Sequence, residues 1–402
     1  MSPFRTRMTS PWQSLPPSSS THAMGNGTAA RATRAEIDLV ALRGNVRLLV
    51  ERSQPSELWA VVKANAYGHG AVPCARAALA AGAAGLCVAL TQEALELRAA
   101  GVTAPIMVMS EQPTSDAGML AEHDVVCVAY NSQYIDALAA AGRRLGKRVT
   151  VHLKVDTGMH RVGVSIDAAL ECAHRIASFP ELRLEGVMTH LATADDPTHP
   201  ATSRQLELFS KVARQIRADL PDVRHVHCAN SAATVRGVAP ESTIMRTGIA
   251  MYGLNPGELD ASLMAELAPV MTLRTQVSHV QRVPAGEGVS YGLRTVLERD
   301  ATIATLPLGY ADGIARRAWQ TSAEVLVGGR RRRIVGVVTM DQMMVDCGDD
   351  AVSIGDEAVL FGAQGGDRIR AEDWASALGT ITYEVVCAVS ARVPRTYVGD
   401  YA

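Results

Sequence analysis

The sequence predicts an α/β fold in which a (β/α)8 barrel of the TIM type is followed by a mostly β domain, and three observations lead to it. A chain of 402 residues is too long for one ordinary core, which favours two domains. From about Leu58, short β-branched runs alternate with alanine-rich stretches, the pattern of parallel βα units. After about Pro256, Val- and Thr-rich alternating runs lie between Gly-rich turns, which indicates a second domain built mainly of strands.

Eight strand candidates can be counted in the first domain, each followed by enough chain for a crossover. They are Leu58–Lys63, Gly85–Leu90, Pro105–Met109, Val125–Ala129, Val149–Val155, Leu184–His190, Arg224–Cys228 and Thr243–Arg246. The clearest helices between them are Gln92–Ala100, Ser132–Arg144 and Ser203–Leu220. A doubly wound open sheet is the alternative, but such a sheet seldom needs eight regular units, so we prefer the barrel.

The domain limits follow from changes in composition. Residues 1–33 mix Pro, Ser, Thr and Arg without an apolar centre, which predicts a disordered extension, with a transit peptide as the weaker alternative. Residues 34–256 are expected to form the barrel and residues 257–402 the β-rich domain. The segment 35–40 alternates like a strand although it precedes the barrel, and we expect it to pair with the second domain.

Two features stand out in the second domain. One helix is expected there, at Ala371–Leu378. The four consecutive arginines Arg330–Arg333 follow Gly328 and Gly329, and we expect them to form the solvent-exposed tip of a hairpin rather than a basic binding patch.

Bulk composition excludes several classes of protein. The formal net charge is -2 and charged residues make up 20% of the chain, which gives no electrostatic case for nucleic-acid binding. No apolar run is long enough to span a bilayer, so no membrane association is expected. The seven cysteines are scattered without a Cys-x-x-Cys pair, which predicts free thiols in the cytoplasm. No metal site is expected.

Lysine 63 is the first candidate for chemistry. In a (β/α)8 barrel the active site lies at the carboxyl ends of the strands, and Lys63 ends the first strand after four apolar residues. Burial at that rim lowers the pKa of an amine, which favours a nucleophilic or imine-forming lysine. A lysine that snorkels out of the barrel mouth is the alternative, and position alone does not separate the two.

Other strand ends also carry polar residues. The fifth strand ends in Lys154 and leads to Arg161, whose planar guanidinium could clamp a carboxylate, although a local ion network is the alternative. The sixth strand ends in His190. Ser231 after the seventh strand and Gly248 after the eighth lie where such barrels bind phosphate through backbone amides.

The order of these motifs is more specific than any one of them. They are Val-Val-Lys-Ala-Asn-Ala-Tyr-Gly-His-Gly, His-Leu-Lys-Val-Asp-Thr-Gly-Met-His-Arg-Val-Gly, Thr-His, Ala-Asn-Ser-Ala-Ala, Arg-Thr-Gly-Ile-Ala-Met-Tyr-Gly, Val-Ser-Tyr-Gly, Gly-Tyr-Ala-Asp-Gly, Met-Asp-Gln-Met and Thr-Tyr-Glu. This series closely resembles, in order, the motifs of the alanine racemase family. The resemblance runs from about Thr33 to Tyr397.

The resemblance implies a pyridoxal-phosphate enzyme that interconverts L-alanine and D-alanine and supplies D-alanine for peptidoglycan. It also implies a homodimer whose active sites are shared between subunits. By match to the family motifs, Lys63 forms the aldimine, His190 packs against the cofactor ring and Arg246 faces the pyridine nitrogen. The residues expected at the phosphate are Tyr67, Ser231, Gly248, Ile249 and Tyr383. Those expected at the substrate are Arg161 and Met340.

Racemisation removes a proton from one face of the α-carbon and returns one to the other, so two bases on opposite faces suit it. The resemblance assigns these roles to Lys63 and to Tyr291 of the partner subunit. An arginine at the ring nitrogen, here Arg246, would leave that nitrogen largely unprotonated and limit side reactions.

Two positions bear on regulation and selectivity. Lys154 matches a lysine that is carbamylated in some members, where the carbamate positions the arginine matching Arg161. Val337 stands where many members have an arginine at the substrate entrance. This difference affects the access corridor, and we expect it to bear on substrate selectivity and rate. The other entrance positions match the family and favour a narrow mouth; they are Tyr310, Arg316, Asp195 and Ile381.

The rival functions are a racemase of broader range or for serine on the same scaffold, and a pyridoxal-phosphate-binding protein without catalysis. A basic-amino-acid decarboxylase is a further alternative, but its cysteine-bearing Gly-Pro motif is not found near the end of the chain.

Overall fold

The structure, a computed structural model, describes residues 31–399 except 258 and 260. Most of the expected disordered extension therefore lies outside the described residues. Thr33, at its end, is buried, and its hydroxyl contacts the hydroxyl of Thr275 at 2.8 Å and the carbonyl oxygen of Pro307 at 3.2 Å. Thr33, which was expected to belong to the extension, is therefore packed against the second domain.

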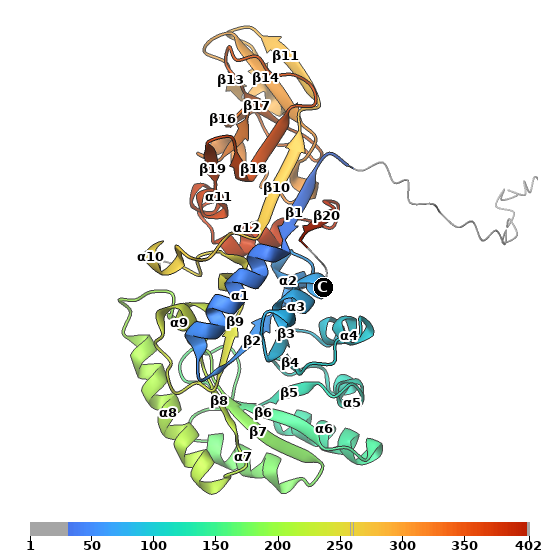
Figure 1. Cartoon of the computed structure of the whole chain (residues 1–402), viewed down its shortest axis with the longest axis vertical. Helices are drawn as coiled ribbons and strands as arrows, with labels where there is room; N and C mark the ends of the chain where they lie inside the picture. Colours follow the sequence, from blue (N-terminus) through green and yellow to red (C-terminus); the bar gives the residue numbers. More distant parts are fainter. Residues whose placement is uncertain (1–30, 258, 260, 400–402) are drawn as a thin grey trace, which may run out of the picture. The chain divides into compact units, whose positions relative to one another are not determined.

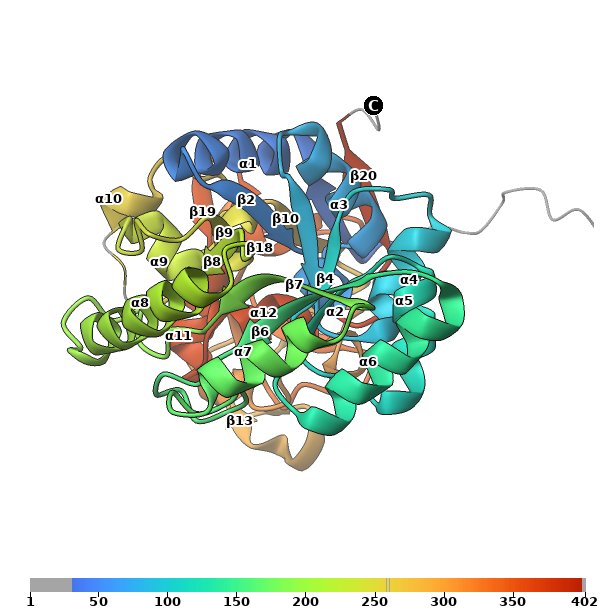
Figure 2. The same cartoon turned by 90° about the horizontal axis from the view of Figure 1, so that it is seen from below.

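Eight parallel strands form the barrel, as predicted, and helices surround them (Figure 2). The strands are β2 (Glu57–Val61), β3 (Gly85–Val88), β4 (Ile106–Val108), β5 (Val126–Ala129), β6 (Val149–Lys154), β7 (Leu182–Met188), β8 (His225–His227) and β9 (Ile244–Thr247). Neighbours along the chain pair up to β8, and β9 pairs with β2. Two hydrogen bonds close the ring, from Thr243 N–H to Val226 O at 2.7 Å and from Arg246 N–H to Ala229 O at 3.2 Å.

The helices of this domain follow the expected alternation. They are α1 (Leu39–Ser53), α2 (Lys63–Tyr67), α3 (Ala71–Ala80), α4 (Thr91–Ala99), α5 (Ala117–Glu122), α6 (Ser132–Leu145), α7 (Ala169–Ser178), α8 (Ala201–Asp219) and α9 (Ser231–Arg236), with the short α10 (Ala261–Met264) after the last strand. Helix α6 shows why the prediction worked. The side chain of Asn131 caps the start of the helix by accepting a hydrogen bond from the N–H of Gln133. Ile135 and Leu138 face the core. Gly146 ends the helix in the left-handed conformation.

The second domain is mostly β, as predicted (Figure 1). Its strands are β10 (Met271–Gln276), β11 (His279–Val283), β12 (Gly288–Val289), β13 (Thr295–Val296), β14 (Ala301–Leu306), β15 (Glu324–Val327), β16 (Arg330–Val335), β17 (Met343–Asp346), β18 (Glu357–Gln364), β19 (Asp367–Ile369) and β20 (Arg395–Val398). The main sheet has the order β11-β14-β17-β16-β15-β18-β10-β1-β20, with β19 beside β18.

The first strand of the chain, β1 (Arg34–Asp38), belongs to this second sheet, which confirms the predicted pairing. It runs antiparallel to β10 and parallel to β20. At its end, the Asp38 carboxylate accepts from the N–H groups of Val40 and Ala41 at 2.8 and 2.9 Å and so starts α1. The first helix of the barrel therefore follows directly on a strand of the second domain, with Asp38 as both the last residue of β1 and the N-cap of α1.

Two expectations for the second domain were wrong. Besides α11 (Ala371–Leu378), which was predicted, the domain contains α12 (Thr382–Ala388), whose β-branched sequence concealed a helix. The run Arg330–Arg333 follows the hairpin turn rather than forming its tip, and three of its members, Arg330, Arg331 and Arg333, are exposed to solvent as expected. Gly328 and Gly329 make the turn, and the arginines form the start of β16. Arg332 is buried and pairs with Asp350 at 2.6 Å, so tertiary contacts rather than solvent satisfy this charge.

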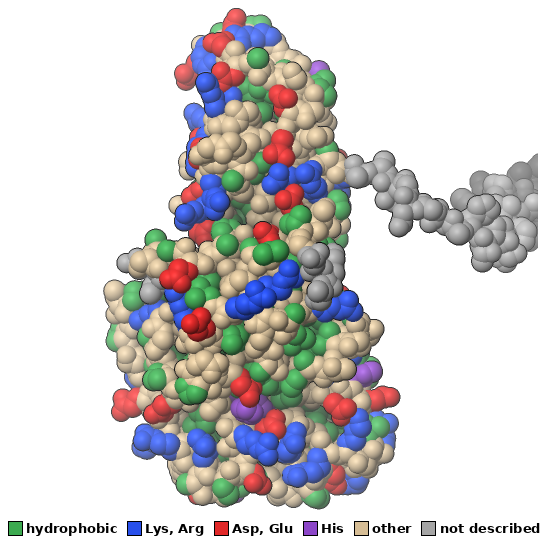
Figure 3. Space-filling view, viewed as in Figure 1, with side chains coloured by type: hydrophobic (Ala, Val, Ile, Leu, Met, Phe, Trp, Pro, Cys, Tyr) green, Lys and Arg blue, Asp and Glu red, His purple; other side chains and the backbone are tan. Residues whose placement is uncertain are grey.

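Charges are mixed on the surface. On the face drawn in Figure 3, side chains of Lys and Arg are interspersed with those of Asp and Glu. Within the described residues, no helix is long and apolar enough to cross a membrane. The same residues contain no group of three or more His, Cys, Asp or Glu side chains arranged to hold a metal ion.

Candidate active site

Lysine 63 follows β2 at the carboxyl end of the barrel. Val62, just before it, is fully buried and donates its N–H to the carbonyl of Cys87 on β3 at 2.9 Å. The four residues after Lys63, Ala64 to Tyr67, all have φ between 51° and 53°. This is one turn of left-handed helix, a conformation that costs L-residues about 1–2 kcal/mol each. Such a strained backbone persists only where contacts with the surrounding structure hold it in place.

Three side chains hold this left-handed turn. The Glu93 carboxylate accepts from the N–H of Ala64 at 2.6 Å and also from two N–H groups at the end of β3. Nδ1 of the buried His69 lies 2.9 Å from Ala66 O and 3.0 Å from Tyr67 O, so it must be the donor. Burial lowers the pKa of His69 to about 4, which keeps that imidazole neutral.

The third side chain comes from the second domain. Arg395 on β20 donates from Nε to the carbonyl of Gly68 at 2.9 Å, just after the turn. Its other nitrogens donate to three carbonyl oxygens between α12 and β20, those of Val389, Ser390 and Val393. Gly68 itself allows close contact with α12, because a Cβ there would lie 2.5 Å from the carbonyl oxygen of Val386. The second domain thus braces the lysine-bearing turn directly.

A cluster of cations surrounds the barrel mouth. Burial is the main cause that lowers the pKa of Lys63, and the positive charge of Arg161 lowers it further. Lys154 is only 5% exposed, and its Nζ lies 3.3 Å from the carbonyl oxygen of Met109. Burial, together with Arg246, Arg161 and Lys63, lowers the pKa of Lys154 to about 8. Both amines are therefore easier to deprotonate than an ordinary lysine.

Arginine 246 is the most buried cation of the site, at 2% exposure. One terminal nitrogen lies 2.6 Å from Nδ1 of His227, and the other donates to Thr189 O at 2.9 Å and to Cys228 O at 3.3 Å. The latter nitrogen also lies 3.5 Å from Nδ1 of His190. The Nε atom is buried without a hydrogen-bond partner among the described residues. Because a guanidinium can only donate, this Nε requires an acceptor.

Histidine 190 lies beside Arg246. Burial, followed by the charges of Arg246 and Arg161, lowers its pKa well below the ordinary value. A neutral imidazole next to that guanidinium avoids a pair of facing cations. The carbonyl oxygen of His190 accepts from the side chain of Gln205, which also donates to Thr157, so the strand end is fixed in place.

The residues expected at a phosphate lie together. Ser231, which begins α9, accepts from the N–H of Gly248 at 2.8 Å. A Cβ added at Gly248 would collide with Oη of Tyr67, so only glycine permits this close approach. The rings of Tyr67 and Tyr383 are 6.0 Å apart, and Ile249 is fully buried next to Gly248. Serine and tyrosine hydroxyls beside backbone amides suit an anionic oxygen group.

These features fit pyridoxal phosphate. The lone buried donor of Arg246 matches an unprotonated ring nitrogen, the cluster around Gly248 matches the phosphate, and Lys63 supplies an amine of lowered pKa. Lys63 Nζ also lies 6.0 Å from the centroid of the Tyr67 ring, which connects the amine to the phosphate cluster.

Two expected site residues are not brought to Lys63 within this chain. Tyr291 and Met340 belong to the second domain and are 71% and 52% exposed. No hydrogen bond, ion pair or ring contact within residues 31–399 joins either of them to Lys63. Val337, expected at the entrance, is only 3% exposed, so its side chain contributes to the domain core in the described chain.

Several positioning side chains were not anticipated from the sequence. Glu93, His69 and Arg395 hold the left-handed turn, and His227 contacts Arg246. His227 could have been noticed, because it ends a strand beside Ser231 and alternates with His225. Nothing in the sequence indicated the left-handed turn, since Lys-Ala-Asn-Ala-Tyr is compatible with an ordinary helix.

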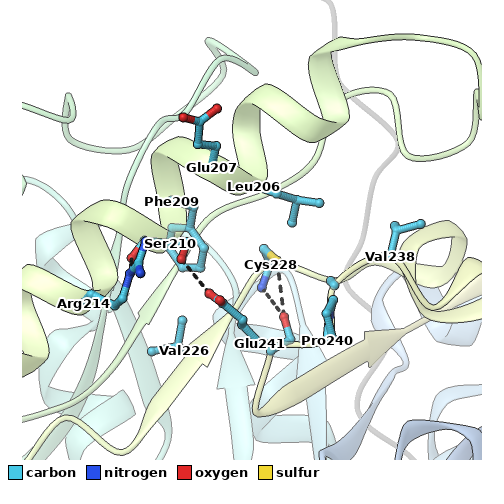
Figure 4. Close-up of a pocket in the computed structure, with 12 residues that line it drawn as sticks. Leu206, Glu207, Phe209, Ser210, Arg214, Val226, Cys228, Val238, Pro240 and Glu241 are labelled. Atoms are coloured by element: carbon cyan, nitrogen blue, oxygen red, sulfur yellow. Dashed lines mark hydrogen bonds between the residues drawn. The ribbon is translucent and has the colours of Figure 1, made fainter.

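An apolar pocket of about 360 Å³ lies away from these residues, between α8, β8 and the loop before β9 (Figure 4). Phe209 and Val226 line it, and the hydroxyl of Ser210 donates to the Glu241 carboxylate at its rim at 2.6 Å. None of the expected cofactor or substrate residues lines this pocket. The candidate site is therefore the barrel mouth rather than this side pocket.

Comparison with known protein families covers most of the chain. The model described as alanine racemase, N-terminal domain, matches residues 37–256. The model described as alanine racemase, C-terminal domain, matches residues 270–397. The two matched segments correspond to the barrel and to the β-rich part of the chain.

Individual relatives are similar over nearly their whole length. The alanine racemase of Frankia casuarinae is 46% identical over 372 residues, which cover 90% of this chain and 96% of that protein. The alanine racemase of Symbiobacterium thermophilum is 44% identical over 375 residues, covering 92% of this chain and 98% of that protein.

Solved structures agree with the sequence comparison. The alanine racemase from D-cycloserine producing Streptomyces lavendulae superposes with a TM-score of 0.87 at 42% identity, covering 93% of this chain and 98% of that one. The enzyme from Bacillus anthracis, solved with bound L-Ala-P, gives a TM-score of 0.87 at 38% identity, covering 94% and 97%. The chain therefore belongs to the alanine racemase family, whose members are pyridoxal-phosphate-dependent isomerases.

Proposed function

We propose that the protein interconverts L-alanine and D-alanine, with Lys63 carrying pyridoxal phosphate at the mouth of the barrel. The observation that carries this proposal is that the same barrel mouth holds both a half-buried amine of lowered pKa, Lys63, and the buried Nε of Arg246, which has no partner among the described residues. When bound, the cofactor supplies electron withdrawal from the α-carbon of the substrate. The remaining tasks fall to side chains and backbone N–H groups of the protein.

Each side chain of the site then has a distinct task. Arg246 would donate to the ring nitrogen without protonating it, because a guanidinium does not give up its proton at ordinary pH. His190 would pack against the ring, and the phosphate would be held by Tyr67, Ser231 and Tyr383 together with the N–H groups of Gly248 and Ile249. Arg161 and the backbone N–H of Met340 of the partner subunit would receive the substrate carboxylate.

The direct test is to incubate the purified protein with L-alanine and to follow D-alanine. We expect D-alanine from the wild type and none from Lys63→Ala, which should also lose the visible absorbance of bound cofactor. Removal of one acid/base group from such an enzyme costs roughly a hundred- to ten-thousand-fold in rate. A wild-type protein that forms no D-isomer would refute the proposed function.

We further propose that Tyr291 of a partner subunit is the second acid/base group, so that the protein works as a homodimer. In support, Tyr291 is 71% exposed and has no contact with Lys63 of its own chain in the described residues. A base on the opposite face of the α-carbon from Lys63 completes the two-base scheme.

Subunit mixing tests the shared site. Lys63→Ala and Tyr291→Phe proteins are each expected to be nearly inactive alone. If sites are shared, random exchange of subunits yields one intact site in each mixed dimer, or roughly a quarter of all sites in a two-fold symmetric assembly. If each chain holds its own complete site, every site in the mixture carries a lesion and no activity returns. A fully active monomer would equally contradict the proposal.

A cytoplasmic location is proposed as well. All seven cysteines are free, and five of them are buried: Cys74, Cys87, Cys127, Cys228 and Cys347. Free buried thiols are typical of a reducing compartment. Cell fractionation with an antibody against the protein tests this, and recovery from the oxidising exterior would contradict it.

A further inference from the structure

A row of polar side chains crosses the inside of the barrel from Arg246 to Glu185. A terminal nitrogen of Arg246 lies 2.6 Å from Nδ1 of His227. Nε2 of His227 lies 2.8 Å from Nδ1 of His152. Nε2 of His152 in turn lies 3.9 Å from Oε2 of Glu185. The three residues beyond Arg246 come from β8, β6 and β7, three neighbouring strands.

The proton positions along this row are determined from one end. Arg246 can only donate, so Nδ1 of His227 must accept. The single proton of a neutral His227 is then on Nε2, and it is donated to Nδ1 of His152. The proton of His152 is therefore on its own Nε2, which faces the Glu185 carboxylate. That last separation, 3.9 Å, is beyond hydrogen-bond length, so the carboxylate acts on the imidazole through its charge.

The backbone is shaped for this arrangement. His152 and His227 are both fully buried. A Cβ at Gly186 would lie 2.7 Å from the imidazole of His152, so glycine leaves the room that the ring occupies. The pairing of β6 with β7 shifts register here, because Val151 is opposite Leu184 and His152 is opposite Gly186. Glu185 is the extra residue of this bulge, and a bulge re-aims the side chain that it carries.

Both imidazoles are neutral in this environment. Burial is the first cause that lowers the pKa of His227, and the charged or titratable groups that face it are Arg246, His152, His225 and Lys154. Burial also lowers the pKa of His152, while the Glu185 carboxylate opposes that shift. Protonation of His227 at Nδ1 would end its acceptance from Arg246, so the contact depends on the neutral form.

We propose that His152, His227 and Glu185 form a polar relay that positions Arg246, with Glu185 orienting His152, His152 fixing the tautomer of His227, and His227 holding the guanidinium. The proposal rests on the role assigned above to Arg246. The relay keeps Nε of Arg246 aimed into the site, since the other nitrogens are already bound. None of its three members touches the cofactor site, so all three are positioning residues.

The far end of the relay lies at the opposite end of the barrel from Lys63. Glu185 is 17% exposed, and it lines a cavity of about 570 Å³ together with residues at the amino ends of the strands. Other residues lining this cavity are Glu57, Trp59, Arg148, Thr150 and His225. Substitution of Glu185 is therefore expected to leave the carboxyl-end loops unchanged.

Four variants test the relay. His152→Leu interrupts it, whereas His152→Asn keeps an acceptor oxygen near the position of Nδ1 and should restore the link to His227. Glu185→Gln keeps the shape and removes the charge. Glu181→Gln is the matched control. Glu185 pairs with Arg183 at 3.4 Å, and Glu181 likewise pairs with Arg143 at 2.8 Å but contacts neither histidine.

The measurement is the affinity of the refolded or dialysed apoprotein for pyridoxal phosphate, followed by quenching of tryptophan fluorescence. The visible spectrum of the bound cofactor is recorded alongside. We expect roughly tenfold weaker binding for His152→Leu, the scale on which loss of an orienting partner acts at metal-bound histidines. His152→Asn should recover most of the affinity, Glu185→Gln should show a smaller loss, and Glu181→Gln should match the wild type.

Two results would overturn the relay. One is wild-type affinity and spectrum in His152→Leu. The other is an equal loss in His152→Asn and His152→Leu, which would mean that ring volume rather than hydrogen bonding matters. If His152→Leu does not fold, the comparison of Glu185→Gln with Glu181→Gln decides, and equal affinities would refute the role of Glu185. Cofactor affinity is measured without alanine, so its outcome is independent of whether the wild type forms D-alanine.

Discussion

The hydroxyl of Ser290 donates to the carbonyl oxygen of Val337 at 2.7 Å, which joins the residue before Tyr291 to the loop that leads to Met340. Ser290 has φ of 64°, an uncommon value for a residue other than glycine. Gly336 makes room for it, because a Cβ there would lie 2.7 Å from Cβ of Ser290. One hydrogen bond therefore stabilises the backbone next to both Tyr291, the proposed second acid/base group, and the loop of Met340, the proposed carboxylate-binding residue.

Ser290→Ala should reduce turnover, because the backbone at Tyr291 loses this hydrogen bond. One such bond contributes about 1 kcal/mol, or roughly fivefold in rate if the loss falls on the transition state. Initial rates in both directions, with kcat and KM separated, measure the effect. Ser278→Ala is the control, since that hydroxyl donates to Thr305 O at 3.0 Å elsewhere in the same domain. Equal rates for the two variants would show that the hydrogen bond from Ser290 to Val337 does not affect turnover.

The lowered pKa of Lys154 should make the stability of the apoprotein depend on pH. Its pKa in the folded chain, about 8, is below the usual 10.5, so the unfolded chain binds more protons between these values. Stability then rises with pH across that window, and the cost of the buried charge is fully present below about pH 8. Lys154→Met should remove this rise in urea unfolding curves, while Lys211→Met, at an exposed position, should retain it.

The same lowered pKa makes Lys154 a candidate for carbamylation, since only the neutral amine reacts. We expect bicarbonate to raise wild-type activity more at pH 8.5 than at pH 7, values on either side of the pKa of about 8, and to have no effect on Lys154→Met. The carbamate would replace a repelling cation near Arg161 with an anion. If bicarbonate leaves the wild-type activity unchanged at both pH values, carbamylation of Lys154 is ruled out.

Gly70→Ala should be strongly destabilising. The φ of Gly70 is 104°, and a Cβ there would collide with Oη of Tyr397 on β20. Gly101→Ala separates the two effects, because Gly101 has φ of 81° with nothing near its Cβ position. We expect a loss of about 1 kcal/mol for Gly101→Ala from conformation alone and more for Gly70→Ala. Tyr397→Phe should restore part of the stability that Gly70→Ala loses. If it does not, the collision with Oη of Tyr397 is not the cause of the loss.

Glu93→Gln should loosen the left-handed turn after Lys63. Three backbone N–H groups donate to its two carboxylate oxygens, and an amide can accept at only one of its two ends. We expect a loss of about 1–3 kcal/mol in unfolding free energy and weaker cofactor binding. Glu96→Gln, on the exposed side of the same helix, should change neither. Thermal unfolding and fluorescence titration with cofactor measure the two effects.

Much of the fold was predictable because the barrel repeats one pattern. Each buried β-branched run became a parallel strand, with ends displaced by a few residues, as between the expected Leu184–His190 and the observed Leu182–Met188. Helix α12 was missed because Thr382 to Val386 has the composition of a strand, and packing of Val385 and Val386 overrides that preference. Arg332 was misjudged because its partner, Asp350, is eighteen residues away in sequence.

The candidate site was predictable only where residues follow strand ends. Lys63, His190 and Arg246 lie together because parallel strands bring their carboxyl ends to one rim. The relay was not predictable, because Glu185 reaches His152 through a bulge that the sequence does not mark. The proposed role of Tyr291 is also beyond any local pattern, since it depends on a second copy of the chain.

Strand β1 has a consequence for the order in which the protein is made. It leaves the ribosome before the barrel, but its partners, β10 and β20, begin at Met271 and Arg395. During synthesis, β1 therefore stays unpaired until the barrel and then β10 have emerged, and it gains its second partner only when β20 has emerged. The helix that it adjoins can join the nascent barrel in the meantime. The second sheet is therefore complete only after β20 has emerged, and a chain released before that point would expose an open strand edge that invites aggregation.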